Sequence, residues 1–233
     1  MRIHGAGNPR GSPLVLIHGL SSSHRCWDRN LAALGADHHV RLVELFPRGR
    51  RGMRFDLSET AQHLRRMLEA GPAPVSVIGH SMGGLIALHL ADQAPELVDR
   101  LVLAAAPVGR RSRSLLGQLG GVVMSGTRTD LQSVSLVMGT LLAAGPMRMA
   151  AATHATLRAD LAGEAAALGM PTLLVWGDDD RLVPVEVGRR LAQLVPNARL
   201  VTIAMAGHQA MWEAPEAFNA AVLSFLTGNP TPR

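Results

Sequence analysis

The chain contains 233 residues, a length that suits one globular domain with or without an insertion. Hydrophobic residues make up 47% and charged residues 18% of the chain, so a sizeable core can form and wholesale disorder is excluded. The net charge of +5 comes from arginine without any lysine, and aromatic residues make up only 3%. A nucleic-acid-binding protein more often shows a basic stripe interleaved with aromatic side chains, so we expect no nucleic-acid partner.

The cysteine content and the apolar runs indicate the compartment. Cys26 is the only cysteine, so no internal disulfide can form, and we interpret it as a small apolar residue. The first residues lack the apolar stretch of a signal peptide. No run of about 18 apolar residues predicts a membrane span. We therefore expect a soluble, cytoplasmic protein.

Short β-rich apolar runs alternate with longer helical patterns, which predicts an α/β fold with a mostly parallel sheet flanked by helices. Ser58 is expected to be the N-cap of the second helix, with acidic Glu59 in its first turn. In chain order, the predicted elements are a strand at 2–4, a strand at 14–17, a helix at 25–35, a strand at 40–45, a helix at 59–69, a strand at 75–78, a helix ending near 94, strands at 100–105 and 172–176, a helix at 185–194, a strand at 199–203 and a helix from about 215.

The alternation stops between Pro107 and Met170, in a stretch rich in Ala, Leu, Gly, Met and Arg with helical spacing. A structureless loop of this length is unusual inside a compact domain. We interpret residues 108–169 as a helical cap or lid, and residues 1–107 and 170–233 as the core domain. Apolar residues of this insertion suggest an apolar substrate, although packing against the core explains them equally well: Leu115, Leu116, Val122, Val123, Met124, Leu136, Val137 and Met138.

Ser81 stands in the spacing Gly79-x-Ser81-x-Gly83, between a β-branched strand and a predicted helix. A nucleophile on a sharp, strained turn needs neighbours without Cβ atoms, and Gly84 adds a further small residue. The turn also places Ser81 at a helix N-terminus, where free N–H groups favour developing negative charge. We therefore interpret Ser81 as a catalytic nucleophile.

A serine hydroxyl needs a base to remove its proton. In proteins with this turn, the partners follow in the order serine, acid, histidine. Of the ten histidines, only His208 lies beyond the cluster Asp178-Asp179-Asp180, and it sits in a Gly-His loop just after the last predicted strand. We interpret His208 as the base, in preference to a solvated loop histidine.

The acid that orients this base is expected in the same aspartate cluster. Chemistry alone does not choose among Asp178, Asp179 and Asp180, because any of them can instead form a turn or cap a helix. The segment after the strand at 100–105 contains no acidic residue, which removes the main competing location.

An oxyanion hole must supply donors aimed at the tetrahedral oxygen. The backbone N–H of Met82, directly after the nucleophile, is one expected donor. The second is expected from the loop His18-Gly19-Leu20, most simply from the N–H of Leu20. We interpret His18 itself as a residue that holds this loop in shape.

These motifs together resemble the α/β-hydrolase superfamily, most of all its bacterial carboxylesterase and lipase-like members. The resemblance covers residues 12–107 and 170–226, and Gly177-x-x-Asp180 is similar to the family's acid motif, which implies Asp180 as the acid. The motifs that carry it are His18-Gly19, Gly79-His80-Ser81-Met82-Gly83-Gly84, Trp176-Gly177-Asp178-Asp179-Asp180-Arg181-Leu182-Val183-Pro184, and Gly207-His208 with Glu213 and Pro215 downstream.

The chain departs from the family pattern after the strand at 40–45. Relatives commonly carry a Pro-Gly-His-Gly-like loop there, whereas this chain has Pro47 followed by the arginine-rich loop Arg48–Arg54. We interpret that loop as a solvated segment, in preference to a contact for acidic substrates or a membrane surface.

The resemblance implies ester hydrolysis through an acyl-enzyme on a small-molecule substrate, with no metal or organic cofactor. Thioester hydrolysis, lactone opening, carbon–carbon bond hydrolysis and acyl transfer on the same fold remain alternatives. Carbon–carbon hydrolases often have Asn where this chain has His80, which disfavours that reaction. A non-catalytic small-molecule receptor is the alternative from another class, and it would not need Ser81, Asp180 and His208 together. The oligomeric state and the physiological substrate are not readable from these patterns.

Overall fold

A computed structural model describes residues 1–47, 54–109, 139–140 and 142–228 of the chain. They form a seven-stranded sheet with the strand order β1-β3-β2-β4-β5-β6-β7. β1 runs antiparallel to β3 and every other neighbouring pair is parallel. The strands are β1 (Arg2–Gly7), β2 (Ser12–Ile17), β3 (His38–Glu44), β4 (Val75–His80), β5 (Val98–Ala104), β6 (Thr172–Gly177) and β7 (Ala198–Ile203).

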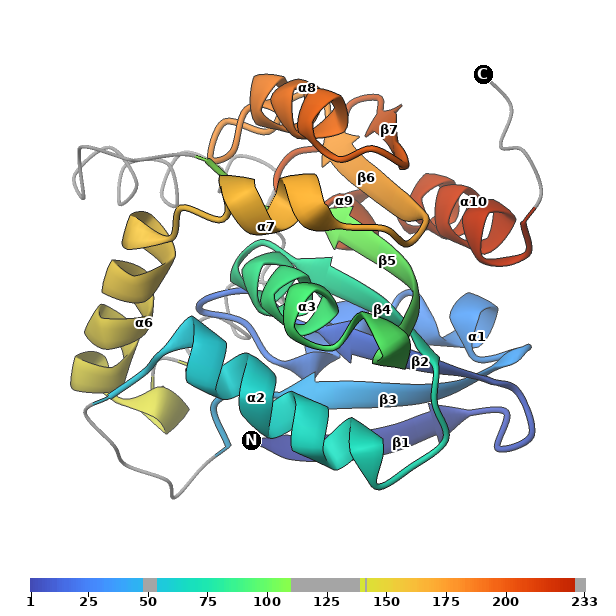
Figure 1. Ribbon diagram of the computed structural model, residues 1–233, viewed down its shortest axis with the longest axis horizontal. Coiled ribbons are helices and arrows are strands. Elements are labelled where there is room, and N and C mark those ends of the chain that lie inside the picture. Colours follow the sequence, from blue (N-terminus) through green and yellow to red (C-terminus); the bar gives the residue numbers. More distant parts are fainter. Residues whose placement is uncertain (48–53, 110–138, 141, 229–233) are drawn as a thin grey trace.

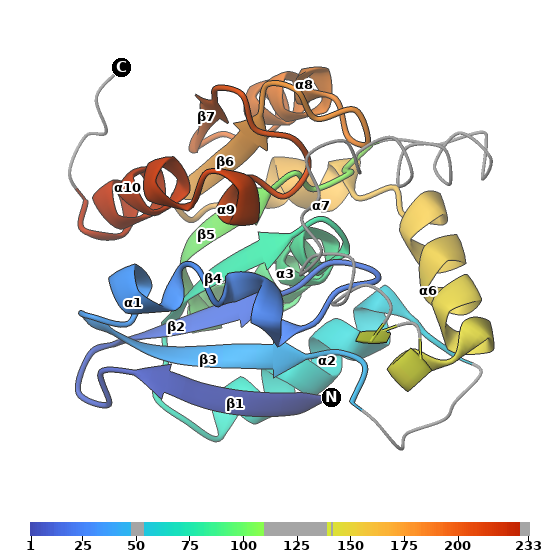
Figure 2. The ribbon, with the colours of Figure 1, turned by 180° about the vertical axis from the view of Figure 1, so that it is seen from behind.

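Helices cover both faces of this sheet (Figures 1 and 2). One face carries α2 (Leu57–Glu69), α3 (Met82–Gln93), α7 (Ala162–Ala167) and α8 (Val185–Leu194). The other face carries α1 (Leu31–Leu34), α9 (Ala210–Glu213) and α10 (Pro215–Leu226), beside a 3₁₀ turn at His24–Trp27. Helices on both faces of a mostly parallel sheet confirm the predicted α/β fold class.

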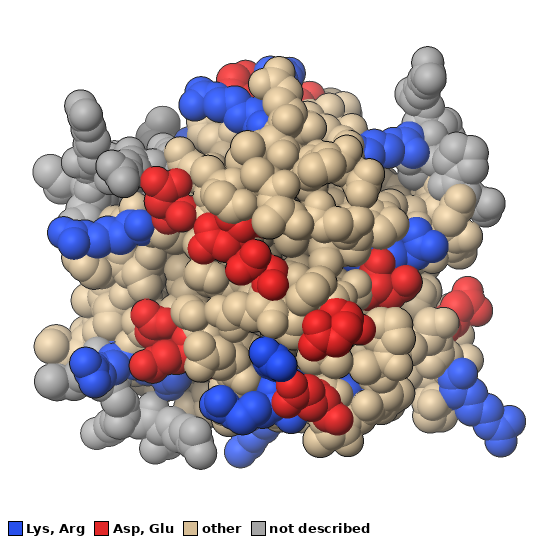
Figure 3. Space-filling model, viewed as in Figure 1, with Lys and Arg blue, Asp and Glu red and all other residues tan. Residues whose placement is uncertain are grey.

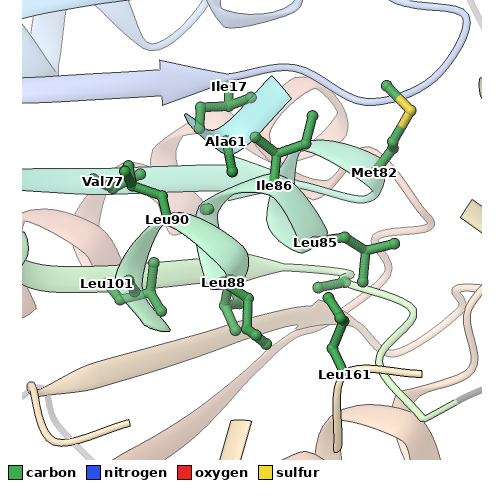
Figure 4. Close-up of a cluster of buried hydrophobic side chains, with 14 of the residues drawn as sticks. Ile17, Ala61, Val77, Met82, Leu85, Ile86, Leu88, Leu90, Leu101 and Leu161 are labelled. Carbon is green, nitrogen blue, oxygen red and sulfur yellow. The ribbon is translucent and has the colours of Figure 1, made fainter. Parts of the chain in front are cut away.

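The strands alternate their side chains between two hydrophobic clusters, as the period of two along a strand requires. Val15, Ile17 and Val77 belong to the cluster that also contains buried residues of α2 and α3. Figure 4 shows Ile17 and Val77 packed with those helices. Leu14, Leu16 and Ile78 belong to the second cluster on the opposite face. Because both faces are buried, the central strands read as nearly continuous apolar runs.

Among the described residues, the Asp, Glu and Arg side chains other than Glu44 and Asp180 are at least partly exposed. Figure 3 shows acidic and basic side chains interspersed on the face formed by α2, α3, α7 and α8. Arg65 pairs with Glu69 at 2.8 Å on α2, and Arg189 pairs with Glu186 at 2.8 Å on α8. Within the described part of the chain, no helix is both long and apolar enough to cross a membrane.

Two local predictions were wrong. The predicted helix at 25–35 is only the 3₁₀ turn at His24–Trp27 and the single turn α1, because the buried Asn30 donates its side-chain N–H groups to Met211 O and Asn219 Oδ1. The N-cap of α2 is Asp56 and not Ser58, because Asp56 Oδ1 accepts the N–H of Glu59 at 2.8 Å.

The described part of the segment between residues 108 and 169 is helical. It contains α6 (Pro146–Arg158), which contacts α2 at one side of the sheet, and α7, which packs on α3. The apolar residues singled out between Leu115 and Met138 lie outside the described residues, as does the arginine-rich loop except Arg54. The division into core and cap stays a prediction.

Candidate active site

Ser81 occupies the turn between the end of β4 and the start of α3, with φ 53° and ψ −119°. Few residues other than glycine adopt a positive φ, and such strain persists only where the surroundings impose it. Here the Ser81 N–H donates to Ala104 O at 2.8 Å on the neighbouring strand. The serine is therefore held in its strained conformation by the sheet.

The glycines of the motif are required by close backbone approach. A Cβ on Gly83 would lie 2.4 Å from Ile17 O and 2.5 Å from His18 O, and one on Gly79 would lie 2.4 Å from Gly83 O. Real Cβ atoms do not approach carbonyl oxygens this closely. Only glycine at these two positions lets α3 start directly against β2 and β4.

Ser81, His208 and Asp180 lie in one hydrogen-bonded line. His208 Nε2 is 3.1 Å from Ser81 Oγ, and His208 Nδ1 is 2.8 Å from Asp180 Oδ2. A carboxylate only accepts hydrogen bonds, so Nδ1 carries the proton and Nε2 is left to accept from the serine hydroxyl. All three residues are buried. The structure thus brings together three residues that are 99 and 28 positions apart along the chain (180 − 81 and 208 − 180).

Asp180 differs from its neighbours in burial and in hydrogen bonding. Its Oδ1 accepts the N–H groups of Leu182 at 2.9 Å and Val183 at 2.8 Å, which leaves Oδ2 for His208. Asp178 and Asp179 are exposed, and Asp179 pairs with Arg181 at 3.3 Å. Of the three candidates, only Asp180 contacts the histidine ring.

The two segments expected to supply oxyanion donors pass beside Ser81. Met82 is the first residue of α3, where backbone N–H groups have no partner within the helix. Leu20 follows Gly19, and a Cβ on Gly19 would lie only 3.1 Å from Ser81 Cβ. The loop that carries Leu20 therefore passes directly against the serine.

This loop is fixed at both ends through His18, His24 and Glu44. His18 Nδ1 donates to Gly19 O at 2.8 Å while its Nε2 accepts the Leu45 N–H at 3.0 Å. His24 Nδ1 lies 2.9 Å from Glu44 Oε2. Burial alone would raise the pKa of Glu44, but the groups that donate to its carboxylate, His24 and the Phe46 N–H, outweigh burial and hold that pKa below its ordinary value. Glu44 is thus an ionised anchor for the loop.

The sequence patterns predicted no contact with the His208 loop for two residues. His80 Nε2 lies 2.9 Å from His208 O, and Glu213 contacts the backbone on both sides of His208. Both belong to quoted motifs, and that placement was the only signal available. The contacts themselves join residues from separate elements and are visible only in the fold.

No metal site emerges in the described ranges. Among those residues, no group of three or more His, Cys, Asp or Glu side chains could hold a metal ion. The arrangement around Ser81 instead combines a hydroxyl, a base oriented by a carboxylate and backbone N–H groups. These are the parts needed for acyl transfer through serine.

The sheet and this arrangement together define the class of protein. The family model described as the Alpha/beta hydrolase family matches residues 14–221, and the chain belongs to this family. It is 30% identical to a protein named "Putative carbamate hydrolase RutD" from Pseudomonas savastanoi pv. phaseolicola, over 96% of this chain and 97% of that one.

Two further comparisons show the range of the family. The chain is 28% identical to a 2-hydroxy-6-oxononadienedioate/2-hydroxy-6-oxononatrienedioate hydrolase of Burkholderia vietnamiensis, over 97% of this chain and 91% of the relative. Among solved structures, it resembles a serine hydrolase involved in carbazole degradation (the CarC enzyme) with a TM-score of 0.79 and 26% identity, over 98% of this chain and 95% of the other. The names of these relatives show that members of the family act on different substrates.

Proposed function

We propose that this hydrolase cleaves carboxylic esters of small or medium, apolar molecules through Ser81, His208 and Asp180. The observation that carries the proposal is the continuous line from Asp180 Oδ2 through the His208 ring to Ser81 Oγ, with both joining distances at hydrogen-bond length. Such a line activates serine, because the histidine can take the hydroxyl proton while the carboxylate stabilises the resulting imidazolium.

The reaction proceeds in two halves. Ser81 Oγ attacks the ester carbonyl as His208 Nε2 takes its proton, and the N–H groups of Leu20 and Met82 stabilise the oxyanion. The alcohol leaves with the proton held by His208, so that the acyl group stays on Ser81. Water then attacks the acyl-enzyme with His208 again as the base, which releases the acid and restores the serine. Neither half requires a metal or an organic cofactor.

A panel of substrates tests the proposal. We expect turnover of short p-nitrophenyl esters by the wild-type protein and none above background by Ser81→Ala. Matched thioesters, lactones, carbamates and a vinylogous 1,5-diketone identify the other reactions of the fold, and acyl transfer to an added alcohol identifies a transferase. Ester hydrolysis that is slower than one of these reactions in kcat/KM would overturn the ester assignment while leaving the serine mechanism intact.

A receptor on the same fold gives a different result. Such a protein would bind a small molecule without turning over any member of the panel, and binding would persist in Ser81→Ala. That outcome would overturn the catalytic proposal as a whole.

A further inference from the structure

The backbone around His208 is held by one carboxylate. The N–H of Gly207 donates to Glu213 Oε2 at 2.7 Å, and the N–H of Gln209 donates to Glu213 Oε1 at 3.1 Å. The two donors flank His208 in the chain, so Glu213 fixes the peptide units on both sides of the histidine. Only a carboxylate offers two acceptor oxygens in this arrangement.

The chain is built around this contact. A Cβ on Gly207 would lie 3.0 Å from Glu213 Oε2 and 3.2 Å from Oε1, so the carboxylate fills the space that a larger residue would need. The single turn α9 brings Glu213 back toward the loop, because the Glu213 N–H donates to Gln209 O at 2.8 Å. The backbone of α9 therefore keeps Glu213 within reach of the loop.

His80, the last residue of β4, contacts the carbonyl group of His208. Its Nε2 lies 2.9 Å from His208 O, and the two imidazole rings are 4.9 Å apart between centroids. The carbonyl only accepts, so Nε2 of His80 carries the proton. Burial, followed by the nearby His208, lowers the pKa of His80 to about 3, which keeps this ring neutral.

We propose that Glu213 and His80 are positioning residues that hold the His208 ring in line with Ser81 and Asp180. This inference rests on the proposed function, because it concerns the same base. His208 must meet Ser81 Oγ at 3.1 Å and Asp180 Oδ2 at 2.8 Å with a single ring orientation. The ring belongs to a loop, and three hydrogen bonds to its backbone give that loop the rigidity of a regular element. Misplacing a reacting group by about 1 Å can cost about 10²-fold in rate.

The first test compares Glu213→Gln with Glu216→Gln. The glutamine at 213 retains one acceptor but turns its NH₂ group toward a backbone N–H, whereas Glu216 is exposed on α10 and makes the same chemical change without touching the loop. We expect Glu213→Gln to lower kcat for a p-nitrophenyl ester by about 10- to 100-fold with KM changed less than about twofold. Glu216→Gln should match the wild type in both constants.

A spectroscopic signature separates positioning from general stability. The His208 Nδ1 proton in the bond to Asp180 should give a downfield proton resonance. We expect that resonance to shift or vanish in Glu213→Gln and to stay unchanged in Glu216→Gln, at a temperature where circular dichroism shows both variants folded.

The second test uses His80, so that the positioning of His208 can still be tested if Glu213→Gln fails to fold. Glutamine can still donate an N–H to His208 O, whereas leucine cannot. We expect His80→Gln to retain kcat within about fivefold and His80→Leu to lose about 10-fold or more. Equal kcat values in this pair would overturn the role of His80.

The results also separate this inference from the proposed function. If the wild-type protein neither turns over the panel nor reacts with a fluorophosphonate, the proposed function fails. If the wild type and Glu216→Gln are active and Glu213→Gln has the same kcat and the same downfield resonance, Glu213 has no positioning role and the serine mechanism still stands.

Discussion

Gly177 and Ala206 bring the turn that carries Asp180 into backbone contact with the loop that carries His208. A Cβ on Gly177 would lie 2.2 Å from Ala206 O. The N–H of Asp179 donates to the same carbonyl at 3.0 Å, and the N–H of Asp178 donates to Ile203 O at 3.1 Å. The distance between acid and base is therefore fixed first by the main chain and only then by their side chains.

Gly177→Ala should push apart the turn that carries Asp180 and the loop that carries His208. Two backbones must move apart to admit the methyl group, which we expect to lower the free energy of unfolding by about 1–3 kcal/mol and to reduce ester turnover. Gly163→Ala is the matched control, because a Cβ at Gly163 in α7 meets nothing within 4 Å; it should stabilise the chain by about 0.5–1 kcal/mol. Urea denaturation and p-nitrophenyl ester assays measure both effects. Wild-type stability and activity in Gly177→Ala would contradict the close contact.

The aspartate cluster offers a comparison within three consecutive residues. Asp180→Asn should lower kcat/KM by about 10⁴-fold, because an amide cannot hold the histidine in the correct tautomer. Asp178→Asn and Asp179→Asn change exposed side chains and should stay within about twofold of the wild type. An Asp180→Asn protein with full activity would show that another group orients His208.

The free energy of unfolding should fall below neutral pH because His80 is buried in its neutral form. The pKa of His80 falls from 6.5 in the unfolded chain to about 3 in the folded chain, so the unfolded state binds more protons between these values. The contribution of His80 is complete above about pH 6.5 and is lost as the pH falls toward about 3, at up to about 1.4 kcal/mol per pH unit.

Urea denaturation of wild type and His80→Gln between about pH 7 and pH 4 isolates this contribution. We expect the free energy of unfolding to fall more steeply with decreasing pH in the wild type than in the variant. Glu44, whose pKa is lowered from 4.5 to about 2, adds a loss in both proteins only below about pH 4.5. Parallel pH curves would mean that folding does not lower the pKa of His80.

Cys26 should be unreactive in the folded chain. It is fully buried, and burial raises the pKa of its thiol to about 12, so almost no thiolate is present near neutral pH. A coloured aromatic disulfide reagent should release one equivalent of thiol only after unfolding, and a maleimide should leave ester hydrolysis unchanged. Rapid labelling of the native protein would refute the assignment of Cys26 as a core residue.

The main features of the sheet could be predicted because they depend on local patterns. Short apolar runs marked β2 and β4, and the glycines around Ser81 marked a turn between a strand and a helix. The expected strand at 2–4 extends to Gly7 as β1, whose pairing with β3 is antiparallel. The predicted bounds of α8 agree with the structure because that helix follows Pro184 directly and buries an amphipathic face.

The errors arose where contacts from distant segments override local preference. Asn30 could belong to a helix, but its buried side chain bonds to α9 and α10. Ser58 is a good N-cap residue in isolation, yet its hydroxyl accepts a hydrogen bond from Gln93 while Asp56 caps the helix. The approach of Glu213 to the loop of His208 also depends on the folded turn α9, and no spacing rule predicts it.

Covalent labelling of Ser81 tests the central claim most directly. A fluorophosphonate reacts only with a serine whose hydroxyl is activated by a base beside oxyanion donors. The account predicts one phosphonyl group per chain, located by mass spectrometry on the peptide that contains Ser81, with no labelling of Ser81→Ala and much slower labelling of Asp180→Asn. A folded wild-type protein that stays unlabelled, or one labelled at another serine, would contradict the assignment of Ser81 as the nucleophile.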